Sequence, residues 1–228
     1  MTRLRRWVGL GAIALLVPLT GSAAIAQSAA EYRQVGIAAR DRGDLTGAIA
    51  ALQSAVELEP ENLSGQIMLG WTLHLAGEGR KAANTLKQAI ALDPFSPQTF
   101  NALGIVYLVN DDLLAAIATH NWAAWIKPDN EIAHYNLSLA YQRLDFHEWA
   151  IAAAERAMAL EPDNPHPVVA LAIAYWRQGA RDQALTTYQE AITMDARYGN
   201  AQFLTYLDQS GFSDEQIQEA QDILRSLN

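Results

Sequence analysis

The sequence predicts an all-α fold: a right-handed superhelical solenoid of helix-turn-helix repeats that ends in a C-terminal capping helix. Three observations support this prediction. A period of about 34 residues runs through most of the chain, small residues recur at fixed places within that period, and alanine is abundant while β-branched residues are sparse. One hairpin of two helices cannot bury its apolar face alone, whereas a stack of hairpins forms a continuous core.

The first 26 residues predict a targeting segment. Arginines among the first six residues give it a positive start, and residues 7–26 carry no charge. Small residues just before Gln27 fit the site at which a signal peptidase cuts, so we expect residues 1–26 to be removed after Ala26. The alternative is an uncleaved anchor, because the 20 uncharged residues of 7–26 are enough to span a bilayer.

The period is marked by proline and by three series of small residues. A small residue is required where two helix backbones approach closely, because a larger side chain would overpack the contact. The prolines are Pro60, Pro94, Pro128 and Pro162, with Ala196 one period further on, and the small series are Gly36, Gly70, Gly104, Ser138 and Ala172; Ala48, Ala82, Ala116, Ala150 and Ala184; and Ala55, Ala89, Ala123, Ala157 and Ala191.

Each period is expected to hold two helices and a turn. In the first unit, Glu31–Asp41 is the first helix, Gly43 belongs to the turn, and Leu45–Leu58 is the second helix. Asp111 and Asp145 are expected to take the place of the turn glycine in later units. The predicted units span residues 29–62, 63–96, 97–130, 131–164 and 165–198.

The tail, residues 199–228, departs from the period and is interpreted as a C-terminal helical cap. Asn200–Gln209 is expected to form one more first helix. Ser213 and Gln216 then fit a capping box, which predicts the start of an amphipathic helix. Its apolar stripe is formed by Ile217, Ala220, Ile223 and Leu224.

The pattern resembles the tetratricopeptide repeat (TPR), in which an aromatic residue, a Leu-Gly pair, a tyrosine, small residues and a proline recur with this period. The resemblance covers residues 29–198 and implies a non-catalytic scaffold that binds other proteins. The tail and the overall character of the sequence also resemble small exported repeat proteins of cyanobacteria. This resemblance implies that the protein is located in the periplasm or the thylakoid lumen. The third unit matches best, through Phe100, Leu103, Gly104, Tyr107, Ala116, Ala123 and Pro128.

Composition excludes several classes of function. The chain has no cysteine, which rules out disulfides and thiolate metal sites, and its formal net charge of −9 argues against a nucleic-acid partner. Neither a cofactor nor a metal ion is expected, and membrane contact is expected only through the N-terminal segment if it is retained. His120 and Ser138 could form a pair on neighbouring helices, but a core histidine with a hydrogen-bonded ring nitrogen is the preferred interpretation. We therefore predict that the protein is not an enzyme.

A concave groove is the predicted binding site. The resemblance places groove residues at fixed positions of each first helix, and here these positions are mostly apolar or aromatic, with arginines only at the N-terminal end. We expect them to bind an apolar or aromatic peptide segment of a protein partner. The predicted groove residues are Arg33, Arg40, Ile67, Trp71, His74, Asn101, Leu108, Tyr135, Leu139, Gln142 and Trp176, with Ile37, Ile105, His166, Val169 and Ile173 beside them.

Trp122, Trp125 and Trp149 are predicted on the outer face of the second helices. They form either a second contact surface, for a partner or a membrane, or a satellite packing cluster. The leading hypothesis is a scaffold in the envelope or the lumen that helps to assemble or retain a multi-protein complex. The alternatives are a structural subunit that uses the outer tryptophans and, from another class, an enzyme or its regulatory subunit.

Overall fold

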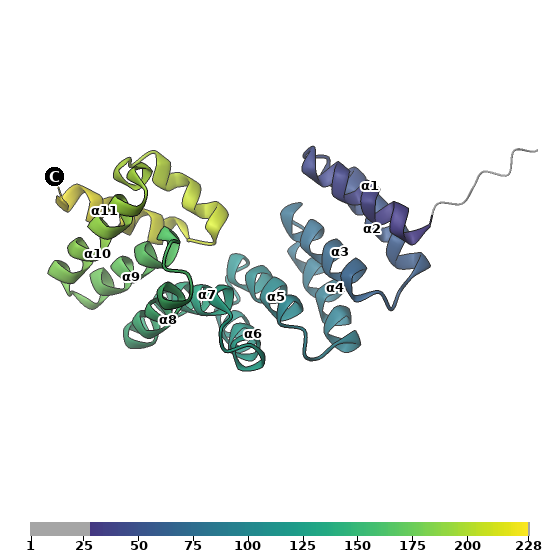
Figure 1. Ribbon diagram of the computed structural model, residues 1–228, viewed down its shortest axis with the longest axis horizontal. Helices are drawn as coiled ribbons and strands as arrows, with labels where there is room; N and C mark the ends of the chain where they lie inside the picture. The colour runs from purple at the N-terminus through teal and green to yellow at the C-terminus, as the bar shows by residue number, and fades with distance from the viewer. Residues whose placement is uncertain (1–27, 228) are drawn as a thin grey trace, which may run out of the picture.

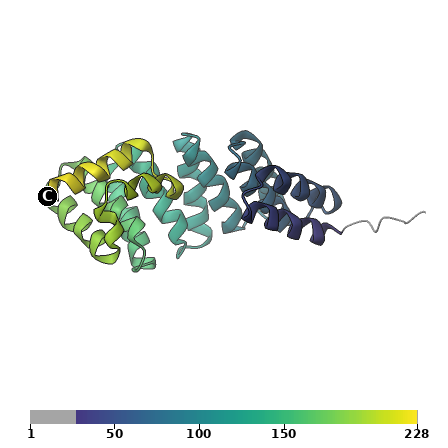
Figure 2. The same cartoon turned by 90° about the horizontal axis from the view of Figure 1, so that it is seen from above.

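The structure is a curved stack of antiparallel helical hairpins. The computed structural model describes residues 28–227, where every helix packs on its neighbour in the sequence and no strand occurs. The hairpins turn progressively and form an arc (Figures 1 and 2), which confirms the predicted all-α solenoid. The hairpin helices are α1 (Ala29–Asp41), α2 (Leu45–Leu58), α3 (Leu63–Leu75), α4 (Gly79–Leu92), α5 (Pro97–Val109), α6 (Leu113–Ile126), α7 (Glu131–Arg143), α8 (His147–Leu160), α9 (Pro165–Gln178) and α10 (Arg181–Met194).

Short polar side chains cap the start of most helices. The Ser28 hydroxyl accepts a hydrogen bond from the Glu31 N–H, and the Glu31 carboxylate accepts one from the Ser28 N–H. This capping box starts α1 at Ala29, before the predicted start at Glu31. Later helices are capped by the side chains of Asp44, Asn62, Ser96, Asp112, Asn130 and Asn164.

The turns inside the hairpins require a left-handed backbone. Gly43, Gly77 and Gly179 have φ angles of 80°, 75° and 87°, and Asp111 and Asp145 adopt 64° and 58°. Aspartate tolerates this conformation better than most residues because its short side chain bonds locally. The two aspartates therefore replace the turn glycine, as predicted.

The first series of small residues is required by packing. A Cβ atom on Gly36 would lie 2.6 Å from Leu52 Cγ, and one on Gly104 would lie 2.5 Å from the ring of His120. Both distances are far below a normal van der Waals contact. Glycine is therefore necessary where the second helix of a hairpin presents a large side chain to the first.

Two arginines repeat one link between hairpins. Arg143 donates a hydrogen bond to the Leu108 carbonyl at 2.8 Å and forms an ion pair with Asp111 at 2.6 Å. Arg177, one period later, donates to the Gln142 carbonyl at 2.8 Å. Each arginine thus satisfies a carbonyl near the end of the previous first helix, which fixes the stacking of hairpins.

The C-terminal part leaves the hairpin pattern, and the predicted α-helix over Asn200–Gln209 is wrong. The chain instead forms two 3-10 helices, η1 (Ala196–Gly199) and η2 (Phe203–Ser210). Leu204 and Leu207 are both buried, and their i, i+3 spacing places both on one face of a 3-10 helix. A 3-10 helix therefore allows Leu204 and Leu207 to be buried together.

The last helix follows the prediction. Ser213 and Gln216 form the capping box, with the Gln216 N–H donating to Ser213 Oγ at 3.3 Å and the Ser213 N–H donating to Gln216 Oε1 at 3.0 Å. Helix α11 (Asp214–Leu227) then buries its predicted apolar stripe against α9 and α10. It folds back along the concave side of the arc (Figure 1).

The predicted targeting segment, residues 1–26, and the alternative anchor, residues 7–26, lie outside the described residues. Within residues 28–227, none of the helices combines the length and the hydropathy that crossing a bilayer requires.

Candidate binding groove

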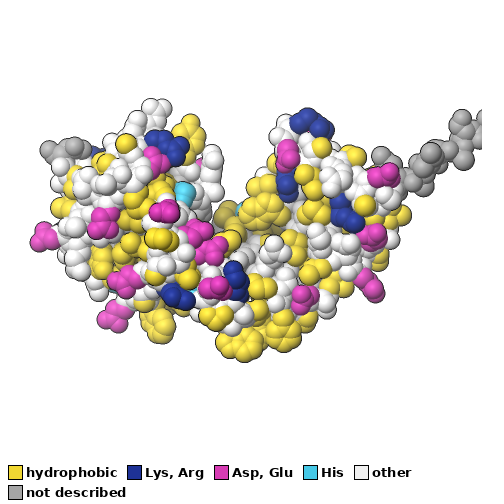
Figure 3. All heavy atoms as spheres, in the orientation of Figure 1, with side chains coloured by type: hydrophobic (Ala, Val, Ile, Leu, Met, Phe, Trp, Pro, Cys, Tyr) yellow, Lys and Arg dark blue, Asp and Glu magenta, His cyan; other side chains and the backbone are white. Residues whose placement is uncertain are grey.

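The concave surface is built from the first helix of each hairpin: α1, α3, α5, α7 and α9 (Figure 1). A hollow separates the N-terminal and C-terminal parts of the molecule, and hydrophobic side chains are exposed on its N-terminal wall (Figure 3). The two halves of this surface differ. The chain itself fills the C-terminal half, and the N-terminal half is open.

Residues 199–227, which we call the C-terminal cap, occupy the groove along α7 and α9. The side chains of Leu108, Leu139 and Gln142 are fully buried. Gly211 lies directly over the two leucines, because a Cβ atom placed there would be 3.6 Å from each. The prediction that these three groove residues face a partner is therefore wrong, since the cap covers them. Val169 and Ile173 are buried in the same core as Leu204, Phe212, Ile217 and Ile223 of the cap.

Tyr135 is also engaged by the cap. Its hydroxyl donates a hydrogen bond to the Ser210 carbonyl at 2.7 Å, and its ring meets the Phe212 ring edge-on at a centroid distance of 6.0 Å. Burial raises the pKa of Tyr135 well above its ordinary value, so the hydroxyl stays protonated and remains a donor. The expectation of a partner at Tyr135 is corrected: the chain's own backbone takes that place.

His166 holds the same point of the cap from α9. Its Nδ1 lies 2.9 Å from Asn164 Oδ1, and this oxygen also accepts the backbone N–H of His166 at 3.0 Å. An amide oxygen can only accept, so Nδ1 carries the proton and Nε2 accepts from the Ser210 hydroxyl at 3.0 Å. Burial lowers the pKa of His166, which favours this neutral form.

Two buried glutamines, Gln142 and Gln216, join the cap to the groove floor. Gln142 Nε2 donates to Ser138 Oγ at 3.0 Å and to the Ala170 carbonyl at 2.9 Å, and its Oε1 accepts from Gln216 Nε2 at 2.9 Å. Gln216 Nε2 also lies 3.3 Å from the Leu139 carbonyl. A buried amide is costly unless it is hydrogen-bonded, so this network specifies one position for α11.

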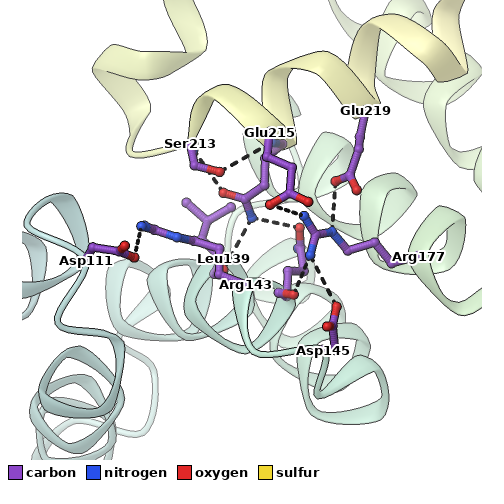
Figure 4. Close-up of polar contacts among 10 residues, drawn as sticks. Asp111, Leu139, Arg143, Asp145, Arg177, Ser213, Glu215 and Glu219 are labelled. Carbon is purple, nitrogen blue, oxygen red and sulfur yellow. Dashed lines mark hydrogen bonds and ion pairs between the residues drawn. The ribbon is translucent and has the colours of Figure 1, made fainter.

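Arg177 connects α9 to the acidic residues near the start of α11 (Figure 4). It contacts Glu219 at 2.8 Å, Glu215 at 3.2 Å and Asp145 at 3.4 Å. Burial opposes the charged guanidinium, but the hydrogen bond and charge of Glu219 outweigh it and raise the pKa of Arg177. The acidic side of the cap helix is thus neutralised on docking.

Trp176 is half-buried against the core that includes the cap. The guanidinium of Arg181 lies 3.4 Å from the centre of its ring and covers one face. The sequence predicts a partner contact at Trp176, but its ring is already used in packing.

The open half of the groove centres on α3. Trp71 and His74 lie with ring centroids 5.1 Å apart, and both side chains are half-buried, as is that of Ile67. Burial lowers the pKa of His74, so this pair presents an uncharged surface at neutral pH. These three predicted residues form one apolar and aromatic wall.

The polar and charged groove residues near this wall differ in how tightly they are bound within the chain. Asn101 is buried and exchanges two side-chain hydrogen bonds with Asn130, at 3.0 and 3.1 Å, so it links α5 to α7 and the prediction of a partner contact there is wrong. Arg33 forms an ion pair with Glu59 at 2.6 Å. Arg40 lies at a looser 3.7 Å from Asp41, and its side chain is 27% exposed.

The outer tryptophans are exposed as predicted: Trp125 and Trp149 by 65% and 66%, and Trp122 by 43%. Trp122 has a structural contact, because its indole N–H donates to the Pro94 carbonyl at 3.4 Å. Trp149 lies 6.0 Å from Tyr141 between ring centroids, in a separate aromatic group.

The proposed Ser–His pair does not form. His120 is fully buried, and burial lowers its pKa to about 3, an effect that a contact with the Gly104 backbone opposes only in part. Ser138 Oγ accepts from Gln142 instead. Neither ring nitrogen of His120 makes a hydrogen bond of normal geometry to the described residues, so the expected bond is also wrong. No cluster of three potential metal ligands occurs within residues 28–227.

The geometry defines a helical-repeat solenoid whose concave face is half filled by its own C-terminus. The profile of the tetratricopeptide-repeat family matches residues 39–104 and 147–203, together more than half of the chain. The protein belongs to the tetratricopeptide-repeat family, whose fold typically serves as a non-catalytic scaffold for protein interactions.

Solved structures share this architecture. A crystal structure of MamA protein is 27% identical and superimposes with a TM-score of 0.65, over 74% of this chain and 92% of that one. MamA from Desulfovibrio magneticus RS-1 (20% identity, TM-score 0.68, 76% and 98% covered) and the TPR protein TTC0263 from Thermus thermophilus (20%, 0.63, 87% and 100%) show the same fold. The comparison with curated protein sequences gives no match.

Proposed function

We propose that this protein is a non-catalytic scaffold outside the cytoplasm that holds an apolar or aromatic segment of a partner protein in the open half of its groove. One observation carries the proposal. The wall of Ile67, Trp71 and His74 rests on the N-terminal core but stays partly open to solvent, in a groove whose other half is filled by a peptide segment of the same chain.

The cap illustrates the chemistry of such a ligand. It contributes an aromatic ring to Tyr135, a backbone carbonyl to the same tyrosine, and carboxylates to Arg177. The open half offers an aromatic pair and, at the end of α1, the loosely paired Arg40. A partner segment with an aromatic or aliphatic residue next to a carboxylate fits this surface.

The proposed setting is the periplasm or the thylakoid lumen, where the scaffold would assemble or retain a multi-protein complex. Support comes from the sequence of residues 1–26, which has the three parts of an export signal. Cell fractionation tests this setting, and recovery of the protein only in the cytoplasmic fraction would contradict it. N-terminal sequencing of the exported protein then distinguishes a cleaved signal segment from a retained anchor.

The binding proposal is tested by capturing partners from the non-cytoplasmic fraction with the tagged full-length protein. Trp71→Ala should remove partners, because a tryptophan that becomes buried in an interface commonly supplies much of the binding energy. Trp176→Ala is the matched control, since that ring lies in the filled half. An unchanged set of partners with Trp71→Ala, in a variant whose circular dichroism is normal, would contradict the groove proposal.

A structural subunit that binds through its convex side is the second candidate, favoured by the exposure of Trp125. Loss of partners only in the double variant Trp122→Ala, Trp125→Ala would select it over the groove.

A further inference from the structure

Hydrophobic side chains project from the convex side where α6 ends and α4 joins α5. Trp125 is 65% and Phe95 62% exposed, and Leu92 is exposed at the end of α4. The ring centroid of Trp122 lies 5.0 Å from that of Trp125 and 6.1 Å from that of the half-buried Phe100, and its indole N–H bonds the carbonyl of Pro94, next to Phe95. We call Leu92, Phe95, Phe100, Trp122 and Trp125 the aromatic ledge. Figure 3 shows hydrophobic side chains gathered along this lower edge, over α6.

The fold does not require tryptophan in this place. Trp122 donates its indole N–H to the Pro94 carbonyl, and one period later Arg156 donates to the Pro128 carbonyl at 3.2 Å in the same way. A polar side chain therefore serves the same structural purpose in the next hairpin. A cluster of exposed rings, in contrast to a single one, indicates a surface that is covered in use.

The shape of the aromatic ledge and its polar groups indicate whether a protein or a membrane covers it. Anchor residues of a protein interface usually fill pockets, and peptide ligands need donors and acceptors that fix their orientation. Here Trp125 and Phe95 are mostly exposed on a convex surface (Figure 3), and the indole N–H of Trp122 is already bound within the chain. The headgroup region of a membrane, by contrast, receives protruding tryptophan and phenylalanine without a fixed set of polar partners.

The charge of the chain selects the type of lipid. The formal net charge is −9, so a negatively charged surface would repel the protein. We propose that the aromatic ledge inserts into the headgroup region of an uncharged, zwitterionic lipid surface, which would hold the scaffold with its groove facing away from the membrane. This inference does not depend on the groove proposal.

The absence of cysteine allows a local test with the full-length protein. Phe95→Cys is labelled with the environment-sensitive fluorophore nitrobenzoxadiazole and mixed with phosphatidylcholine vesicles. The matched control is Phe146→Cys, which replaces a ring that is 49% exposed beside Tyr141, just before α8 and outside the ledge. Both variants keep residues 1–27, so any vesicle binding by that segment is common to both.

We expect the emission at position 95 to rise and shift to shorter wavelength with vesicles, while emission at position 146 stays unchanged. Adding Trp125→Ala to the labelled Phe95→Cys variant should weaken its vesicle response by roughly tenfold, the effect of withdrawing one aromatic side chain. Phosphatidylglycerol in the vesicles should reduce the response. An equal response at both positions, or none at position 95, would overturn the proposal. An increase without vesicles that grows with protein concentration would assign the ledge to a second copy instead.

Discussion

The two halves of the concave surface use the same helical frame in opposite ways. In the N-terminal half, Ile67, Trp71 and His74 remain half exposed on α3. In the C-terminal half, Leu139 and Gln142 stand on α7 but are completely buried under the cap. The period determines which residues face the groove, and a segment without the period determines which of them stay available.

The largest expected effect is a loss of folding stability in acid. It comes from His120, which lies in α6, where the two halves of the molecule meet. Its pKa is about 3 in the folded chain, against an ordinary value of 6.5. Between these values the unfolded chain binds a proton that the folded chain refuses, so stability present above pH 6.5 is lost as the pH falls towards 3. The loss is on the order of 5 kcal/mol. Urea unfolding as a function of pH measures it.

His120→Leu is the control for this effect, since leucine occupies the corresponding position in the first two hairpins, as Leu52 and Leu86. The variant should lose most of the pH dependence between 6.5 and 3. An unaltered pH dependence would show that other groups cause the acid sensitivity.

Truncation of one aromatic residue in each half should give unequal losses of stability. Phe212 in the cap is only 4% exposed, so Phe212→Ala should cost about 3 kcal/mol, whereas Trp71→Ala should cost about 2 kcal/mol because that ring is only partly buried, at the edge of the N-terminal core. Denaturant unfolding of both variants tests the difference. Equal losses would mean that the cap does not form part of the core.

A smaller difference in the loss of stability is expected between one arginine of each half, Arg177 and Arg33. The Arg177 side chain is 9% exposed and satisfies both Glu219 and the Gln142 carbonyl, so Arg177→Ala should cost roughly 2 kcal/mol. Arg33→Ala should cost about 0.5 kcal/mol, because its partner Glu59 is 46% exposed and water replaces the lost contact. Thermal unfolding at low and high salt measures both. A larger loss at Arg33 would reverse the comparison.

The 34-residue period was sufficient to predict the helices and turns of the repeats. The helix predicted over Leu45–Leu58 is observed with the same bounds, and the turns at Gly43, Asp111 and Asp145 have the expected left-handed backbone. These features depend on local capping, turn chemistry and nearest-neighbour packing, all of which recur once in every repeat. The start of α1 at Ala29 was missed although Ser28 stands one period before the cap residue Asn62, because the recurring cap residues were not used to place the helix starts.

The filled groove could not be predicted, because its contacts join residues far apart in sequence. Gln216 reaches Gln142 across a separation of 74 positions, Tyr135 reaches Ser210 across 75, and no period relates the partners. The family positions correctly place Leu139 on the concave side but carry no information on what covers it. The sequence features that could have indicated the covered groove were Gly211 and Phe212, a glycine followed by an apolar residue directly before the capping box.

Thiol accessibility tests the division of the groove most directly. In this cysteine-free chain, Ile67→Cys and Leu139→Cys each place a single thiol on the concave face, one in each half. The thiol at position 67 should react with Ellman's reagent directly from the folded state, slowed only by its partial burial. The thiol at position 139 should react at least about a hundredfold more slowly than the thiol at position 67, because its reaction must await an opening of the cap. Comparable rates at the two positions would contradict the account, since they would mean that the cap leaves the C-terminal half of the groove open.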